Sequence, residues 1–126
     1  MFELSVKTHF SAAHQLVGYD GPCANPHGHN WEIELFLRGS RLNELGMLAD
    51  FREIKGALRE AMQELDHLDL NKLPAFVRVN PTSENIARYL HEKMAAALNG
   101  GHRWVHKVTV CETPGTAASY WEDDCV

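Results

Sequence analysis

Residues 31–38 read Trp-Glu-Ile-Glu-Leu-Phe-Leu-Arg, and large apolar side chains occupy every second position from Trp31 to Leu37. Successive side chains of an extended chain point to opposite faces, so this alternation gathers the apolar side chains on one face. The positions between them carry mostly charged side chains. The stretch therefore predicts a β-strand that buries one face and exposes the other.

A similar alternation lies upstream, in residues 2–10, where every second position is apolar except Thr8. It predicts another half-buried strand. The glycine, proline and aspartate residues within 18–22 are typical of a turn or loop. The two strands can therefore pair as a long antiparallel hairpin.

The apolar period lengthens after Asp50. Through residues 51–65 apolar side chains recur at spacings of three and four, the stripe of an amphipathic helix that we expect to end near Asp66. Residues 81–84, Pro-Thr-Ser-Glu, are typical of a helix start. A second apolar stripe follows over residues 86–98, and Asn-Gly-Gly then stops it.

Strand-like alternation returns in residues 104–112 and 116–122, on either side of a Pro-Gly turn. The order strand, strand, helix, helix, strand, strand predicts one α+β domain over residues 1–126, with an antiparallel sheet and helices on one of its faces. The two outer edges of such a sheet need a partner. We therefore expect a homo-oligomer in which several sheets close into a barrel.

Composition and charge exclude several classes of protein. The formal net charge of −5 argues against a general nucleic-acid binder, because neutralising phosphates requires a basic face. No stretch approaches the roughly 20 apolar residues that cross a membrane. The first ten residues lack the basic start and apolar run of a signal peptide, so a cytoplasmic protein is expected.

Histidine is frequent, with eight residues, and His27 and His29 flank Gly28. Alternate residues of an extended chain share a face and lie roughly 6–7 Å apart, so both imidazoles can reach one ion. The hairpin would bring His14 beside them, although His9 is a rival for the third position. Three imidazoles suit zinc and leave a fourth position open for water or substrate, as in catalytic sites. Other transition ions also suit such a site.

Three further histidines and two of the three cysteines are interpreted as structural or surface residues. The third cysteine, Cys23, lies four residues before His27 in a loop, where a thiol can face an open site. A nearby cation lowers the pKa of a thiol and favours the reactive thiolate. The residues given the structural interpretation are His91, His102, His106, Cys111 and Cys125.

Three further polar residues are candidates for chemistry. Asp66 and His67 place a carboxylate and an imidazole next to each other in the sequence, and this combination is used in proton transfer. They can pair directly only if the helix has ended, because adjacent helical residues do not face each other. Glu112 ends a predicted strand, where its carboxylate could accept two parallel hydrogen bonds from a guanidine-like group. The alternative is a solvated residue at the end of a strand.

Five segments together resemble the 6-pyruvoyltetrahydropterin synthase family, and most of all its bacterial branch, the 6-carboxytetrahydropterin synthases of queuosine biosynthesis. The resemblance spans nearly the whole chain in the right order. The segments are Ser-Ala-Ala-His (11–14), Cys-Ala-Asn-Pro-His-Gly-His (23–29), Leu-Asp-His-Leu-Asp-Leu-Asn (65–71), Pro-Thr-Ser-Glu-Asn (81–85) and Cys-Glu-Thr (111–113).

The resemblance implies a tunnelling fold, built as trimers that stack into hexamers, and a lyase that requires Zn²⁺. Its substrate would be 7,8-dihydroneopterin triphosphate, and its products 6-carboxy-5,6,7,8-tetrahydropterin, acetaldehyde and triphosphate. By the same resemblance His14, His27 and His29 bind zinc; Cys23, Asp66 and His67 are catalytic; and Glu112 anchors the pterin, with Thr82 and Ser83 assisting.

The sequence leaves some choices open. Residues 24–26 and Gln15 lack the cations that many relatives carry there, which leaves Lys7 or a neighbouring subunit to contact the triphosphate. The product could be 6-pyruvoyltetrahydropterin instead. Two non-enzymatic alternatives are a zinc- or pterin-binding module, and a protein whose histidines bind no metal.

Overall fold

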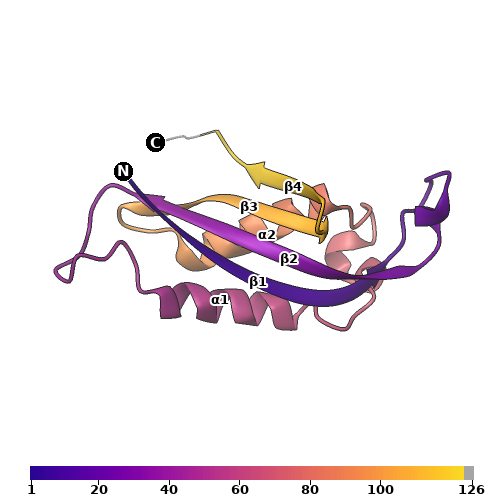
Figure 1. Cartoon of the computed structure of the whole chain (residues 1–126), viewed down its shortest axis with the longest axis horizontal. Coiled ribbons are helices and arrows are strands. Elements are labelled where there is room, and N and C mark those ends of the chain that lie inside the picture. The colour runs from indigo at the N-terminus through magenta and orange to yellow at the C-terminus, as the bar shows by residue number, and fades with distance from the viewer. Residues whose placement is uncertain (124–126) are drawn as a thin grey trace.

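The computed structural model describes residues 1–123, and the interpretation of Cys125 falls outside this range. The predicted order of elements is confirmed, with four antiparallel strands in the sheet order β1-β2-β3-β4 and two helices (Figure 1). The strands are β1 (Phe2–His14), β2 (His27–Gly39), β3 (Arg103–Thr113) and β4 (Thr116–Trp121), and the helices are α1 (Phe51–Gln63) and α2 (Ser83–Leu98).

Strands β1 and β2 are longer than predicted, and this difference positions the site. Strand β1 continues through the small residues 11–13 to His14, and β2 begins at His27. The sequence did not predict this extension, because alanine and serine differ little in hydrophobicity. The side chains of the extension nevertheless alternate in burial, since Ala12 and His14 are buried while Ser11 is half-buried. His14 thus lies inside the strand and directly opposite His27.

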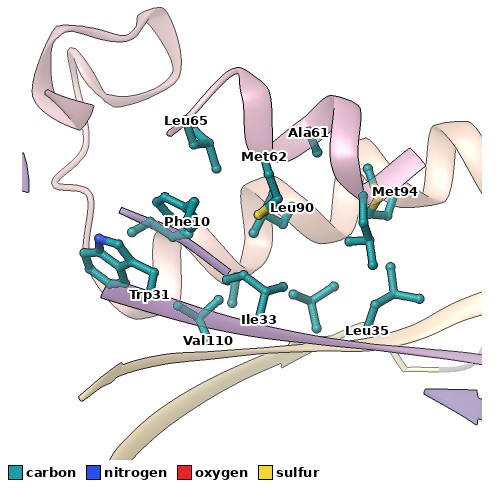
Figure 2. Packing of buried hydrophobic residues seen from close by; sticks show 14 of the residues in the cluster. Phe10, Trp31, Ile33, Leu35, Ala61, Met62, Leu65, Leu90, Met94 and Val110 are labelled. Atoms are coloured by element: carbon teal, nitrogen blue, oxygen red, sulfur yellow. The ribbon is translucent and has the colours of Figure 1, made fainter. Parts of the chain in front are cut away.

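The core lies between the sheet and the helices (Figure 2). Ile33 and Leu35 of β2 face α2, whose Leu90 and Met94 point toward the sheet. All four are at most 2% exposed. Burial of a side chain of this size contributes about 1.5–3 kcal/mol, so the packing fixes β2 firmly. A rigid strand is what holds the histidines at its end in place.

Trp31 closes the core at the end of the sheet that carries the histidines. Its ring stacks on Phe10, with centroids 5.8 Å apart, and its indole N–H donates to the carbonyl of Ala12 at 3.2 Å. The same indole contacts the rings of His14 and His29, with centroid distances of 4.9 and 5.3 Å. The core therefore continues without a gap into the histidine cluster.

The segment between the helices is irregular and was not assigned from the sequence. After α1 the chain passes through a turn and the short 3-10 helices Leu70–Lys72 and Pro74–Phe76. The turn is bound to the edge of β1 by two backbone hydrogen bonds, from His67 N to Ser11 O at 2.5 Å and from Ala13 N to Leu68 O at 3.1 Å. These bonds carry Asp66 and His67 to the histidine end of the sheet.

No helix within residues 1–123 is long and apolar enough to cross a membrane. Strands β1 and β4 form the outer edges of the sheet. The oligomer that these edges suggest, and the single domain over 1–126, stay predictions.

Candidate metal centre and active site

The structure brings His14, His27 and His29 together. The hairpin register sets His14 opposite His27 and Ala12 opposite His29, so all three rings lie on the same face of the sheet as the core. The ring centroids are 4.4 Å apart for His14 and His27, 5.1 Å for His14 and His29, and 4.7 Å for His27 and His29. One ion can contact all three rings at this spacing.

Backbone carbonyls orient two of the rings. His14 Nδ1 lies 2.7 Å from the carbonyl of Pro81, just before α2, and His27 Nδ1 lies 2.8 Å from the carbonyl of Asn25. A carbonyl only accepts, so each Nδ1 carries the proton and each Nε2 is left with a free lone pair. Metal-binding histidines are commonly fixed by such an outer hydrogen bond.

The Nε2 atoms of His14 and His29 are buried and, among residues 1–123, lack a partner in hydrogen-bonding geometry. Burial also lowers the pKa of His29, against a smaller opposing effect of the Glu112 charge. The neutral imidazole that burial favours is the form that binds metal. A buried nitrogen lone pair without a partner costs free energy, and a metal ion that accepts the lone pair removes this cost. Imidazole nitrogens are common zinc ligands, so these residues fit zinc.

Glu112 joins this group, which the sequence did not predict. Its Oε1 lies 2.9 Å from the Nε2 atoms of both His14 and His29, and 4.0 Å from that of His27. The four ligand atoms fall within 4.8 Å of one another. Glu112 was expected at the pterin instead. A carboxylate in this position can either complete the coordination of an ion or hold a ligand directly beside it.

Asp66 and His67 pair directly, as the sequence allowed if the helix had ended. Helix α1 ends at Gln63, and His67 adopts a left-handed backbone conformation with φ of 60°. This conformation turns the imidazole back, so His67 Nδ1 lies 3.0 Å from Asp66 Oδ2. The Ser11 N–H donates to Asp66 Oδ1 at 2.8 Å and, with His67, lowers the pKa of that carboxyl. An ionised Asp66 thus orients an exposed imidazole.

An open pocket lies beside the Asp66–His67 turn. Its volume is about 500 Å³, and Gly28, His29 and His67 are among the residues that line it. Gly28 has no atom within 4 Å of where a β-carbon would stand, so the pocket is open above it. The exposed imidazole of His67 is therefore accessible to a small molecule in this pocket.

A sequence model of 6-pyruvoyl tetrahydropterin synthases matches residues 3–123. The chain belongs to the 6-pyruvoyl tetrahydropterin synthase family. The 6-carboxy-5,6,7,8-tetrahydropterin synthase of Synechocystis sp. is 36% identical over 117 residues, which cover 89% of this chain and 87% of that protein. The human 6-pyruvoyl tetrahydrobiopterin synthase is 32% identical, with 94% of this chain and 90% of that protein covered.

The fold agrees with this assignment. The solved structure of the Caenorhabditis elegans 6-pyruvoyl tetrahydropterin synthase superposes with a TM-score of 0.87 at 30% identity, covering 97% of this chain and 96% of that chain. The predicted family and the predicted arrangement of strands and helices are therefore confirmed.

Cys23 lies outside the metal-binding group. It belongs to a short 3-10 helix, Pro22–Ala24, in the loop that joins β1 to β2 at their histidine-bearing ends (Figure 1). Its carbonyl accepts from the N–H of Leu16 at 2.8 Å, and its side chain is half-buried. No cysteine of residues 1–123 joins the four clustered ligands. Its predicted role as the family's thiol is therefore a proposal.

Thr82 and Ser83 lie at the start of α2, next to the carbonyl that orients His14. Thr82 Oγ1 accepts from the N–H of Asn85 at 3.1 Å and caps the helix. The cap explains these residues structurally, and their predicted contact with substrate stays a prediction.

The residues that sequence reasoning missed act through their backbone. The carbonyls of Asn25 and Pro81 orient the rings, yet any residue type supplies a carbonyl, so no sequence signal marks them. The position of Glu112 had a weak signal, because alternation along β3 puts it on the same face as Val108 and Val110. That signal becomes useful only once β3 is known to pair with β2.

Proposed function

We propose that this chain is a zinc-dependent lyase that converts 7,8-dihydroneopterin triphosphate to 6-carboxy-5,6,7,8-tetrahydropterin, with release of acetaldehyde and triphosphate. The reaction would serve queuosine biosynthesis. The observation that carries the proposal is the cluster of three histidines, two of them with a buried Nε2 that lacks a hydrogen-bond partner, together with the paired Asp66–His67. The relative from Synechocystis sp. that bears the corresponding name supports the choice of product.

His14, His27 and His29 would hold the zinc ion. When bound, the ion supplies positive charge that stabilises negative charge on side-chain oxygens of the substrate and acidifies the adjacent C–H bonds. The Cys23 loop adjoins the two histidine-bearing strand ends, so its thiolate is the candidate base for such a proton.

The Asp66–His67 pair is suited to return a proton at a second position. Asp66 accepts from Ser11 N and pairs with His67 Nδ1, which fixes the ring and leaves Nε2 pointing away from the carboxylate. An imidazole held in this way can donate a proton to substrate. The open pocket gives substrate access to this ring.

Product analysis tests the proposal. Zinc-loaded protein is incubated with dihydroneopterin triphosphate, and the pterin, triphosphate and acetaldehyde are quantified. We expect equal amounts of 6-carboxytetrahydropterin and acetaldehyde. No turnover by the intact oligomer would reject the proposed function.

A second candidate is the biopterin-type reaction, which yields 6-pyruvoyltetrahydropterin. The 32% identity to the human 6-pyruvoyl tetrahydrobiopterin synthase favours it, as does the likeness to the Caenorhabditis elegans structure. The same assay separates the two, because this reaction releases triphosphate without acetaldehyde.

Replacing Glu112 by glutamine separates its two possible roles. We expect Glu112→Gln to keep its zinc, because three histidines remain, and to raise KM by about 10- to 100-fold through loss of charged hydrogen bonds to the pterin. Metal content by elemental analysis and KM by initial rates are the measurements. Loss of the zinc would instead make Glu112 a metal ligand.

The assembly also belongs to the proposal. We expect a homo-oligomer, trimers stacked into a hexamer, because β1 and β4 leave both edges of the sheet without a further strand within residues 1–123. Light scattering on the purified protein measures its mass directly.

A further inference from the structure

The loop that carries Cys23 is held by hydrogen bonds more than by packing. It joins β1 to β2 over residues 15–26 and projects beyond the end of the sheet (Figure 1). Residues 17–22 are all exposed, and no residue of the loop is buried. A segment with few buried contacts opens easily, so its position depends on the hydrogen bonds that attach it to the rest of the chain.

Two asparagine side chains attach the start of this loop. Asn71 Oδ1 accepts from the N–H of Gln15 at 2.8 Å, and Asn71 Nδ2 donates to the carbonyl of Gln15 at 3.0 Å. Asn80 repeats the pattern on Val17, with distances of 2.9 and 3.0 Å. A side-chain amide offers an acceptor and a donor together, so each asparagine binds both backbone groups of one residue, as a neighbouring strand would. We call Asn71 and Asn80 the asparagine clamp.

Both asparagines are fixed independently of the loop. Asn71 lies in the 3-10 helix Leu70–Lys72, and its N–H donates to the side chain of Asp69 at 3.1 Å. The carbonyl of Asn80 accepts from the side chain of Asn85 at 2.9 Å, in the first turn of α2. Removal of either amide therefore leaves the backbone of its own segment in place.

A further bond connects the clamped residues to Cys23. Leu16 lies between Gln15 and Val17, and its N–H donates to the carbonyl of Cys23 at 2.8 Å. Within residues 1–123, the other hydrogen bonds of the loop join it to itself or to His27. The asparagine clamp is therefore the link between the loop and the segment that precedes α2.

The same segment also orients a metal-binding histidine. Pro81 follows Asn80, and its carbonyl lies 2.7 Å from His14 Nδ1. Gln15, which Asn71 holds, directly follows His14. The ring of His14 and the loop of Cys23 are thus both bound to residues 71–81, which fixes the one relative to the other.

We propose that the asparagine clamp positions Cys23 relative to the zinc-binding histidines, so that Asn71 and Asn80 are positioning residues for the proton transfer. The task of the thiol rests on the proposed function, whereas the hold on the loop rests on the hydrogen bonds alone. A group that acts by orienting a catalytic residue affects the chemical step, and a displacement of 1 Å can cost about 100-fold in rate. The clamp is therefore expected to act on kcat and not on KM.

The test compares the zinc-loaded, assembled full chain with the variant Asn71→Ala/Asn80→Ala. The two single variants replace it if thermal melting shows that the double variant does not fold. The matched control is Asn43→Ala, which removes an asparagine that likewise accepts from two backbone N–H groups, those of Leu45 and Met47, in the loop after β2. Zinc content, kcat, KM and amide hydrogen exchange at single residues are measured on each protein.

We expect the N–H of Leu16 to exchange roughly tenfold or more faster in the clamp variant, because the loop opens once its attaching hydrogen bonds are lost. This N–H bonds to neither asparagine, so its exchange reports the position of the loop. The value of kcat should fall about 10- to 100-fold, with KM and zinc content unchanged. Exchange at the buried Leu35 should not change, which separates loop release from a general loss of stability. Asn43→Ala should match the wild type in every measurement.

Unchanged exchange at Leu16, or faster exchange with a wild-type kcat, would overturn the proposal. Loss of zinc from the clamp variant would also overturn it, because the clamp would then act on His14 and not on the thiol. The two proposals fail separately. Faster exchange at Leu16 in a protein without turnover would reject the lyase and retain the clamp, whereas wild-type kcat in the clamp variant would reject the positioning role and retain the lyase.

Discussion

His29→Ala is expected to purify with far less than one zinc ion per chain and to lose turnover by at least about a hundredfold, since even outer-shell changes cost metal sites 10- to 100-fold. The variant removes one of three imidazoles whose Nε2 atoms converge, and two ligands hold an ion poorly. Elemental analysis after chelator-free purification measures the first effect, and initial rates of product release measure the second.

His29 is a better choice than His14 for this experiment. Both rings contact Trp31, but the His14 side chain is only 2% exposed whereas that of His29 is 20% exposed, so removal of His14 would disturb the core more. The matched control is His102→Ala, which removes an exposed imidazole outside the clustered ligands. Full metal content in His29→Ala would contradict the three-histidine site.

Cys23→Ala is expected to retain one zinc ion per chain and to lose turnover by about 10²- to 10⁴-fold, the usual contribution of a general acid or base. The thiol stands outside the group of metal-binding atoms, so its removal leaves the ion in place. The measurements are metal content and kcat on the same preparation, with Cys111→Ala as the matched loss of a half-buried thiol.

This variant also decides between an enzyme and a binding module. In a module whose zinc serves stability alone, the Cys23 thiol has no chemical task. Unchanged activity in Cys23→Ala would therefore remove Cys23 from the mechanism and favour the non-catalytic alternative.

The parts of the site that the sequence predicts depend on local geometry. His27 and His29 share a face because alternate residues of any strand do. His14 joins them because a hairpin between neighbouring strands follows from two alternating segments and one turn, and the register sets His14 opposite His27. Both inferences depend only on residues that are close together in the sequence.

The parts of the site that the sequence does not predict depend on residues far apart in the sequence or on rare backbone conformations. Glu112 reaches the histidines because β3 pairs with β2 in a register that sets Cys111 opposite Glu32, and no residue pattern in either strand predicts that register. The Asp66–His67 contact requires the left-handed backbone of His67, which is uncommon outside glycine. Such conformations cost roughly 1–3 kcal/mol and tend to occur at functional sites. Here the backbone bond from His67 to Ser11 holds it.

Product analysis with the metal removed and restored tests the central claim most directly. The assembled protein is stripped with a chelator, titrated with zinc, and assayed with dihydroneopterin triphosphate at each step. We predict that formation of 6-carboxytetrahydropterin and acetaldehyde rises with zinc and reaches its plateau at one ion per chain. Full turnover by the stripped protein, or no turnover by the fully loaded oligomer, would contradict the account.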